Sequence, residues 1–322
     1  MSFVFGPIPS RRLGRSLGVN NIPPKICSYS CVYCQIGLTD SMSIERKEFY
    51  PLEEIVAEVS ERVEQLKNTG EQIDYITFVP DGEPTLDINI GKEIQLLKPL
   101  GINIAVITNA SLLWVKEVQE ELLLADWVSI KIDTVNDKIW HKINRPDRKL
   151  NLPQILSGIK SFATSFNGIF VTETMLTKGV NDDKESLSMI AQFVRTLNPD
   201  TSYILIPTRP PAEKFVESPS EENLNTAYQI FDDLINVELL TYQEGIDFGC
   251  SSDAEKELLG ILAVHPMREE AVEAFIKKSG ADDDLVQILF KNNQIKKVNY
   301  NGSLYYIKNI RKQKTKARID VN

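Results

Sequence analysis

The sequence predicts an α/β protein with a parallel β-sheet covered by helices, because short apolar segments alternate with amphipathic helical patterns along most of the chain. Strands that are apolar throughout are typical of parallel sheets, which are buried on both faces. The chain has 322 residues, of which 42% are hydrophobic and 25% charged. These values fit an ordinary globular protein with one large domain and a small second one. A doubly wound sheet and a barrel both fit the alternation.

The alternation predicts six strand–helix units. The strands are expected at residues 17–22, 74–79, 102–108, 127–133, 169–176 and 202–207. The helices are expected at residues 52–67, 91–99, 113–124, 152–166, 183–197 and 221–235. In the first helix, for example, Ile55, Val59, Val63 and Leu66 fall on one stripe. Ligands bind at the carboxyl ends of the strands in either architecture, so polar residues just after each strand are the candidates for chemistry.

The segment from Asp253 onward has a different pattern. Three helix-length apolar patterns are followed by two β-like runs joined at Asn301-Gly302, and Asn-Gly between such runs is a strong hairpin signal. We therefore expect a core domain at 1–250, a small winged-helix-like α+β domain at 251–310 and a basic tail at 311–322. The alternative is a helical cap that covers the open end of a barrel.

Charge is unevenly distributed. The net charge is −9, but residues 291–318 contain nine Lys or Arg and no Asp or Glu. With Asp320 included, the last 32 residues carry +8. Such an arm is compatible with RNA contact, and a solvated tail is the alternative. No apolar run approaches the roughly 20 residues of a membrane span, and the N-terminus lacks a signal-peptide pattern. We expect a cytoplasmic protein with no membrane partner.

Three of the four cysteines, Cys27, Cys31 and Cys34, fall within "CSYSCVYC". A disulfide would leave one thiol over and is disfavoured in a reducing compartment. Structural zinc needs four ligands, usually as two pairs, and the second pair is missing. A [4Fe–4S] cluster on three thiolates would keep one iron open for a substrate or cofactor, and we favour it. Cys250 is expected to be a small buried apolar residue.

The spacing Cys-x3-Cys-x2-Cys, with Tyr33 before the last cysteine, resembles the signature loop of the radical S-adenosylmethionine (radical SAM) superfamily. In that family the open iron chelates the amino and carboxylate groups of S-adenosylmethionine, and one electron splits it to methionine and a 5′-deoxyadenosyl radical. The resemblance implies that Cys27, Cys31 and Cys34 hold the cluster and that Tyr33 lies against the adenine or the cluster. It also implies an incomplete (β/α)6 barrel of the TIM-like kind, and it covers roughly residues 15–210.

Two strand ends carry residues that fit this resemblance. Gly82 and Glu83, in "PDGEPTL", look like the family turn that receives the methionine amino group, although Asp81 stands where the family usually has glycine. Thr108 and Asn109 follow the third strand with short polar side chains. We expect Gly82, Glu83, Thr108 and Asn109 to contact the cofactor.

The fourth strand ends in "SIKIDT", where Lys131 and Asp133 point the same way because residues two apart share a strand face. Buried charges on a strand are costly unless they are paired or used. We expect contact with the S-adenosylmethionine carboxylate or ribose. A mutual Lys131–Asp133 ion pair is the alternative.

Further segments resemble the subgroup that includes the tRNA wyosine-base synthases: "FGPIPSRRLGRSLGVN", "KINRPDR", "TKGVND" and "IPTRPP". Within them Arg145, Asn181, Asp182 and Arg209 follow strands and are candidates for substrate contact, since Arg grips a carboxylate or phosphate with two hydrogen bonds. Tethers between loops are the alternative. Archaeal wyosine synthases carry additional cysteines, so we expect neither a second cluster nor that reaction here.

The sequence thus predicts a radical enzyme that receives electrons from a ferredoxin- or flavodoxin-like donor and abstracts hydrogen from a substrate. An RNA base, held with help from the C-terminal domain and tail, is the preferred substrate. A peptide, a protein or a small metabolite is the alternative. A second alternative is an iron–sulfur redox sensor that binds DNA, but such a sensor needs none of the polar residues at the strand ends.

Overall fold

The computed structural model describes residues 2–242, 245–249, 253–282 and 284–309. Its main feature is one eight-stranded sheet in the order β1-β2-β5-β6-β7-β8-β9-β10. The strands are β1 (Val4–Ser10), β2 (Gly14–Val19), β5 (Tyr75–Phe78), β6 (Asn103–Thr108), β7 (Trp127–Lys131), β8 (Ile169–Met175), β9 (Thr201–Leu205) and β10 (Val237–Leu240). All neighbours from β2 to β10 pair in parallel, whereas β1 pairs antiparallel with β2. The prediction of a parallel α/β sheet is confirmed.

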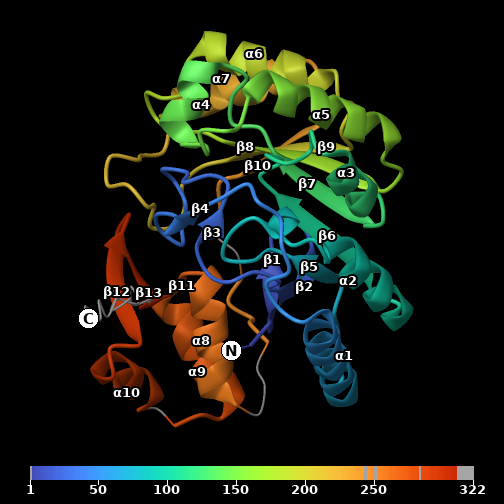
Figure 1. Ribbon diagram of the computed structural model, residues 1–322. Helices are drawn as coiled ribbons and strands as arrows, with labels where there is room; N and C mark the ends of the chain where they lie inside the picture. Colours follow the sequence, from blue (N-terminus) through green and yellow to red (C-terminus); the bar gives the residue numbers. More distant parts are fainter. Residues whose placement is uncertain (1, 243–244, 250–252, 283, 310–322) are drawn as a thin grey trace, which may run out of the picture.

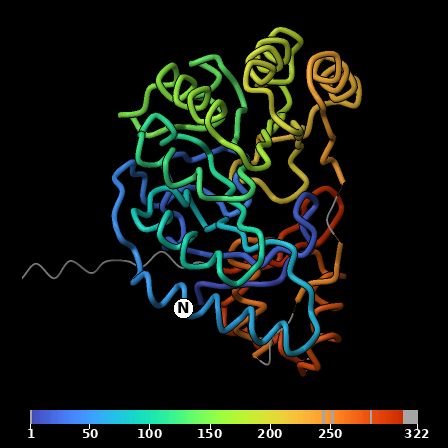
Figure 2. Tube along the Cα trace, turned by 90° about the vertical axis from the view of Figure 1, so that its right-hand side faces the viewer, coloured from blue at the N-terminus to red at the C-terminus, as the bar shows by residue number. Residues whose placement is uncertain are grey.

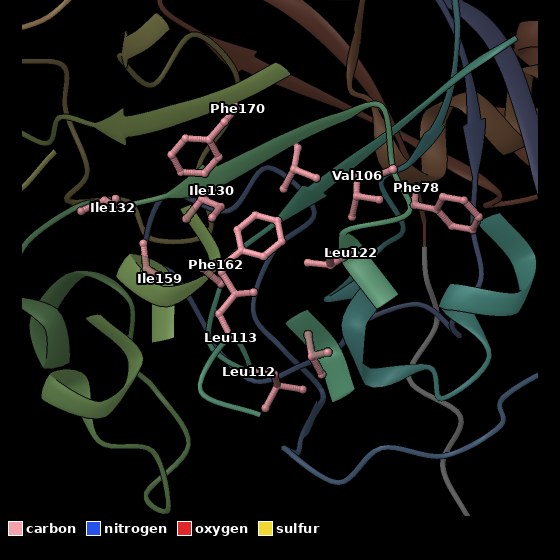
Figure 3. Packing of buried hydrophobic residues seen from close by; sticks show 14 of the residues in the cluster. Phe78, Val106, Leu112, Leu113, Leu122, Ile130, Ile132, Ile159, Phe162 and Phe170 are labelled. Atoms are coloured by element: carbon pink, nitrogen blue, oxygen red, sulfur yellow. The ribbon is translucent and has the colours of Figure 1, made fainter. Parts of the chain in front are cut away.

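The helices of the core lie on the outer face of this curved sheet (Figure 1). They are α1 (Leu52–Thr69), η1 (Pro84–Leu86), α2 (Ile90–Leu97), η2 (Lys98–Leu100), α3 (Lys116–Leu122), α4 (Asp137–Ile143), α5 (Leu152–Ser165), α6 (Lys184–Arg195) and α7 (Glu221–Asp232). Figure 3 shows the packing between the two layers, where strand residues such as Phe78, Ile130 and Phe170 meet Leu122 and Phe162 from the helices.

Local sequence explains where these helices begin. Asn151 caps α5 by accepting a hydrogen bond from the Gln154 backbone N–H, and Asp183 caps α6 in the same way from Ser186. An N-cap of this kind satisfies a backbone donor that the first turn leaves unpaired. The strand–helix connections are thereby fixed, and the carboxyl ends of the strands are left open on one side of the sheet.

The inner face of the sheet has its own apolar layer. It comprises Leu13, Ala105, Trp127, Val171, Tyr203, Leu205 and Leu240. Leu13 comes from the turn between β1 and β2, and the neighbouring Arg11 donates hydrogen bonds to the carbonyl oxygens of Leu240 (2.9 Å) and Tyr242 (2.8 Å). β1 and β10 are the two edges of the sheet and do not pair with each other. The hairpin nevertheless contacts β10 through the Arg11 side chain.

A smaller unit follows the core. It contains α8 (Ala254–Val264), β11 (Met267–Arg268), α9 (Glu269–Ser279), α10 (Leu285–Lys291), β12 (Ile295–Tyr300) and β13 (Ser303–Lys308). Its three strands are ordered β11-β13-β12, and the expected Asn301-Gly302 hairpin is confirmed, with both residues at positive φ. Figures 1 and 2 show this unit, orange to red, beside the dark-blue N-terminal hairpin, from which Phe5 and Ile8 join its core.

Two expectations fall on parts of the chain outside the described residues, namely Cys250 and the basic tail at 311–322. Within the described ranges, no helix has both the length and the apolar character that crossing a membrane requires.

Candidate active site

The three clustered cysteines lie on the long loop that follows β2. Cys27 belongs to the two-residue strand β3 (Ile26–Cys27), which pairs with β4 (Ser41–Met42). Cys34 closes a turn by donating its backbone N–H to the Cys31 carbonyl oxygen (3.1 Å). The backbone N–H of Val32 bonds to the Ile143 carbonyl oxygen at 2.9 Å, which anchors the loop to the end of α4. The fold therefore holds the loop against the carboxyl ends of the strands.

The surroundings of the three thiols suit a metal cluster. Burial raises the pKa of the Cys27 and Cys34 thiols, and burial together with the charge of Asp133 raises the pKa of Cys31 to about 12. Thiolates at these positions therefore need a strong cationic partner. In the described part of the chain, no three Cys, His, Asp or Glu side chains converge on a point suited to a single metal ion. A [4Fe–4S] cube, which spreads its thiolates over separate irons, fits this donor set better than zinc does.

Two asparagines donate hydrogen bonds to sulfur atoms of the cysteine loop. Asn109 donates from Nδ2 to Cys27 Sγ at 3.5 Å and to Ser28 Oγ at 2.9 Å. Asn144 donates from Nδ2 to Cys31 Sγ at 3.4 Å and to Asp133 Oδ2 at 2.6 Å. Hydrogen bonds to the sulfurs are one means by which a protein tunes an iron–sulfur cluster. Asn109 was predicted as a site residue, whereas Asn144 was not, although it lies in the "KINRPDR" segment.

The Gly82-Glu83 turn meets both the cysteine loop and the end of β6. A Cβ at Gly82 would lie 1.8 Å from the Ile26 carbonyl oxygen, so only glycine permits this approach. The buried Glu83 carboxylate accepts hydrogen bonds from Thr108 Oγ1 (2.6 Å), the Asn109 backbone N–H (2.8 Å) and both Oγ1 and the backbone N–H of Thr85. The structure therefore brings together the site residues predicted after the second and third strands.

Lys131 and Asp133 bond to different partners, so the alternative of a mutual pair is not what the structure shows. Lys131 donates to Glu173 Oε2 at 2.9 Å, and its Nζ lies 5.9 Å from the centre of the Tyr33 ring. Asp133 accepts hydrogen bonds from the Tyr33 hydroxyl, from Asn144 and, at 2.9 Å, from the backbone N–H of Met175. Tyr33 thus links the cysteine loop to Lys131, the last residue of β7, and to Asp133, which follows the strand.

Glu173 is a central residue that the sequence reasoning missed. It is 1% exposed on β8 and accepts hydrogen bonds from Lys131, from Ser129 Oγ (2.6 Å) and from Arg12. Burial alone would raise the pKa of this carboxyl, but the charges of Arg12 and Lys131 outweigh it and hold the pKa well below the usual range. A charged side chain within the apolar segment "IFVTETML" is the signal that could have identified it.

Asp81 occupies the position where the sequence departs from the family turn. It is 0% exposed, and neither oxygen of its carboxyl group has a hydrogen-bond partner among the described residues. Burial raises the pKa of Asp81 to about 7, while the charges of Lys308 and Lys25 act in the opposite direction. Burial of this acid is costly for folding, and the charges of Lys308 and Lys25 together with a contact to Asn20 offset that cost only in part.

The four residues predicted to contact substrate are not brought together. Arg145 forms an ion pair with Glu213 between two loops. The Asn181 side chain bonds to the backbone of Asp133, Met175 and Thr177, so it braces the loop after β8.

Asp182 supports the same loop, because it accepts hydrogen bonds from the Gly179 backbone N–H (2.7 Å) and Asn223 Nδ2 (2.9 Å). Arg209 differs from these three. It donates to Gln35 Oε1, next to Cys34, and its Nη2 lies 2.8 Å from His265 Nε2 of the C-terminal unit. Arg209 also lines a cavity beside the cysteine loop.

The cysteine loop, the glycine–glutamate turn and the open ends of a parallel sheet are features of one class of enzyme. A sequence profile of the Radical SAM superfamily matches residues 21–190, which is more than half of the chain. The chain belongs to the radical SAM superfamily and is therefore an enzyme. Membership implies a [4Fe–4S] cluster and S-adenosylmethionine as cofactors.

The chain is also similar to curated proteins and to a solved structure. A UPF0026 protein from Methanocaldococcus jannaschii is 44% identical over 97% of both chains. A UPF0026 protein from Helicobacter pylori strain J99 is 31% identical over 95% of this chain and 97% of its own. A radical SAM methyltransferase from Sphaerobacter thermophilus, 17% identical, superposes with a TM-score of 0.54 over 71% of this chain and 67% of that one, which shows a shared fold.

Proposed function

We propose that this enzyme holds one [4Fe–4S] cluster on Cys27, Cys31 and Cys34 and uses it to cleave S-adenosylmethionine reductively. The observation that carries the proposal is the arrangement of three desolvated thiols opposite the Gly82-Glu83 turn. When bound, the cluster supplies the electron that converts S-adenosylmethionine to methionine and a 5′-deoxyadenosyl radical, which abstracts hydrogen from the substrate. A ferredoxin- or flavodoxin-like protein is the proposed electron donor.

The chain's own residues would position the cofactors. Lys131 places a positive charge that lowers the pKa of Cys34 against the effect of burial, and so favours the thiolate that iron requires. Asn109 and Asn144 donate to the other two sulfurs. The Tyr33 hydroxyl donates a hydrogen bond to Asp133 and so connects the cysteine loop to the segment after β7. Electrostatic preorganisation of this kind is the protein's share of cofactor chemistry.

The proposal is tested by anaerobic reconstitution with iron and sulfide, followed by dithionite and S-adenosylmethionine. Wild-type protein should form 5′-deoxyadenosine, and Cys31→Ala should lose both the cluster and the product. Cys250→Ala is the matched control, since it removes the one cysteine outside the loop, and it should retain both. Absence of 5′-deoxyadenosine from cluster-loaded wild-type protein would refute the proposal.

A role for the C-terminal unit in RNA contact is a second candidate. The element order α8, β11, α9, α10, β12, β13 and the strand order β11-β13-β12 support a winged helix. Lys291 and Lys296 are exposed on α10 and β12 of this unit. We propose that they contact phosphate groups of an RNA. A contact of this kind weakens with increasing salt.

The RNA proposal predicts a change in salt dependence. The double variant Lys291→Gln and Lys296→Gln should weaken RNA retention and lower the slope of log affinity against log salt by about 1 to 2. The control is Lys116→Gln, which removes an exposed lysine from α3 of the core. Equal RNA affinity and equal slope for the double variant and the wild type would exclude this role.

A further inference from the structure

Each thiol of the cysteine loop lies near a buried carboxyl group that disfavours negative charge on the sulfur. These carboxyl groups are Glu83 near Cys27, Asp133 near Cys31 and Asp81 near Cys34, and the charge of each raises the pKa of its cysteine in addition to the effect of burial. A cluster on these thiolates would gain one further negative charge on reduction. The three carboxyl groups therefore act to lower its reduction potential.

Asn144 provides a hydrogen-bond donor that acts in the opposite direction at Cys31. Its side chain is 4% exposed, and its Nδ2 lies 3.4 Å from Cys31 Sγ and 2.6 Å from Asp133 Oδ2. The amide nitrogen carries two hydrogens, so one serves each acceptor. Ser30 and Val32, which flank Cys31, donate their backbone N–H groups to carbonyl oxygens at the end of α4, at 3.0 and 2.9 Å. The fold thus holds the amide of Asn144 opposite this sulfur.

Asn109 provides the corresponding donor at Cys27. Its Nδ2 lies 3.5 Å from Cys27 Sγ and 2.9 Å from Ser28 Oγ. Its Oδ1 accepts a hydrogen bond from the Ser111 backbone N–H at 2.9 Å, so the amide is held at both ends and its nitrogen must face the sulfur. Two of the three sulfurs therefore have an oriented amide N–H from a side chain.

We propose that Asn109 and Asn144 are positioning residues that raise the reduction potential of the cluster by donating N–H···S hydrogen bonds to Cys27 and Cys31. The proposal rests on the radical SAM function proposed above and adds how the protein regulates the same site. One electron passes from the ferredoxin- or flavodoxin-like donor to the oxidised cluster, and no bond to carbon breaks in this step. A hydrogen bond to sulfur strengthens as the sulfur becomes more negative, so it stabilises the reduced state and offsets the nearby carboxyl groups.

The test is a redox titration of cluster-loaded protein, followed by EPR and carried out without S-adenosylmethionine so that no turnover occurs. Asn144→Leu keeps a branched side chain of similar size and removes the amide. At a fixed solution potential it should lower the ratio of reduced to oxidised cluster about tenfold, which corresponds to about 59 mV for a one-electron couple. Asn109→Leu should change the ratio in the same direction.

The matched control is Asn181→Leu. Asn181 is 0% exposed, and its Nδ2 bonds to the carbonyl oxygens of Asp133 (2.8 Å) and Met175 (2.9 Å) rather than to a sulfur. This variant also removes a buried amide next to Asp133, so it should lose stability but keep the wild-type potential. A purely structural role for Asn144 would instead give the same potential in both variants.

Should a leucine variant take up no iron, wild-type protein labelled with ¹⁵N in its asparagine side chains provides a second measurement. Pulsed EPR of the reduced cluster should then show a weak coupling to asparagine nitrogen. Wild-type potentials in Asn144→Leu and Asn109→Leu, or the absence of that coupling, would overturn this inference alone. Failure of wild-type protein to take up any cluster would overturn the proposed function and this inference with it.

Discussion

The substitution Gly82→Ala tests how closely the glycine–glutamate turn fixes the cysteine loop. An ideal Cβ at this position would lie 1.8 Å from the Ile26 carbonyl oxygen and 2.9 Å from the Ile26 carbonyl carbon, whereas ordinary contacts begin at 3.4 Å. Ile22 Cδ1, at 2.8 Å, belongs to a side chain that can move, but the nearest atom is a backbone oxygen, so side-chain rotation alone does not relieve the clash. The loop must retreat by about 1.5 Å, and overpacking of this kind costs about 1–3 kcal/mol.

Gly82→Ala should impair cluster assembly even where the protein still folds, because Ile26 directly precedes Cys27. Metal sites tolerate deviations of only about 0.2 Å in ligand distance, so displacing this loop should prevent stable assembly of the cluster. The assay is iron and acid-labile sulfide per chain after anaerobic reconstitution, together with the visible absorbance of the cluster. We expect Gly82→Ala to retain little iron while its far-ultraviolet circular dichroism remains that of the wild type.

Gly260→Ala is the control for the added methyl group. Its Cβ would lie 3.6 Å from Phe5 Cβ, an ordinary contact, and alanine is favoured over glycine inside a helix such as α8. This variant should take up iron like the wild type. If Gly82→Ala also takes up a full complement of iron and sulfide, the close approach of turn and loop does not determine cluster assembly, and the reasoning is refuted.

Three further outcomes follow from the buried charges and from the docking of the C-terminal unit. Glu173→Gln should lower the unfolding free energy at pH 7 by about 3–5 kcal/mol, because it leaves two buried cations uncompensated; since the pKa of Glu173 is lowered by folding, urea titrations should show the difference shrinking as the pH falls below about 4. Asp81→Asn should stabilise the protein at pH 8 by up to about 4 kcal/mol, because the pKa of Asp81 rises to about 7 on folding and wild-type stability falls as pH increases between about 4 and 7; equal stability at pH 8 would show that the carboxyl group is better solvated than its burial indicates. Tyr305→Phe removes the 2.9 Å hydrogen bond from the Tyr305 hydroxyl to the Thr208 carbonyl oxygen and should lower the opening free energy of β13, measured by hydrogen exchange, by about 1 kcal/mol; unchanged protection would contradict this role.

The sequence predicted the elements whose patterns are local and missed those defined by tertiary contacts. The six expected strands are present because apolar runs of that length have few other solutions in a layered fold. The first strand, β1, contains Gly6-Pro7, which argues against a strand, and its pairing with β2 is irregular between Phe5 and Ile8. The last strand, β10, has only four residues, and its position is set by its parallel pairing with β9.

The same distinction applies to the site. Glu83, Thr108 and Asn109 were predictable because the carboxyl ends of parallel strands meet at one edge of the sheet. Arg12 was not, because it reaches Glu173 only through the folding of the β1–β2 turn into the open sheet, 161 residues away in sequence. The pairing of Arg145 with Glu213 was not predictable either, because position after a strand does not determine which way a long side chain turns.

The N-terminal hairpin is linked to the cysteine loop by a series of charged residues. Arg12 bonds to Glu173, which in turn bonds to Lys131. Burial would lower the pKa of Lys131, but the charge of Glu173 raises it, so the lysine stays protonated and continues to favour the Cys34 thiolate.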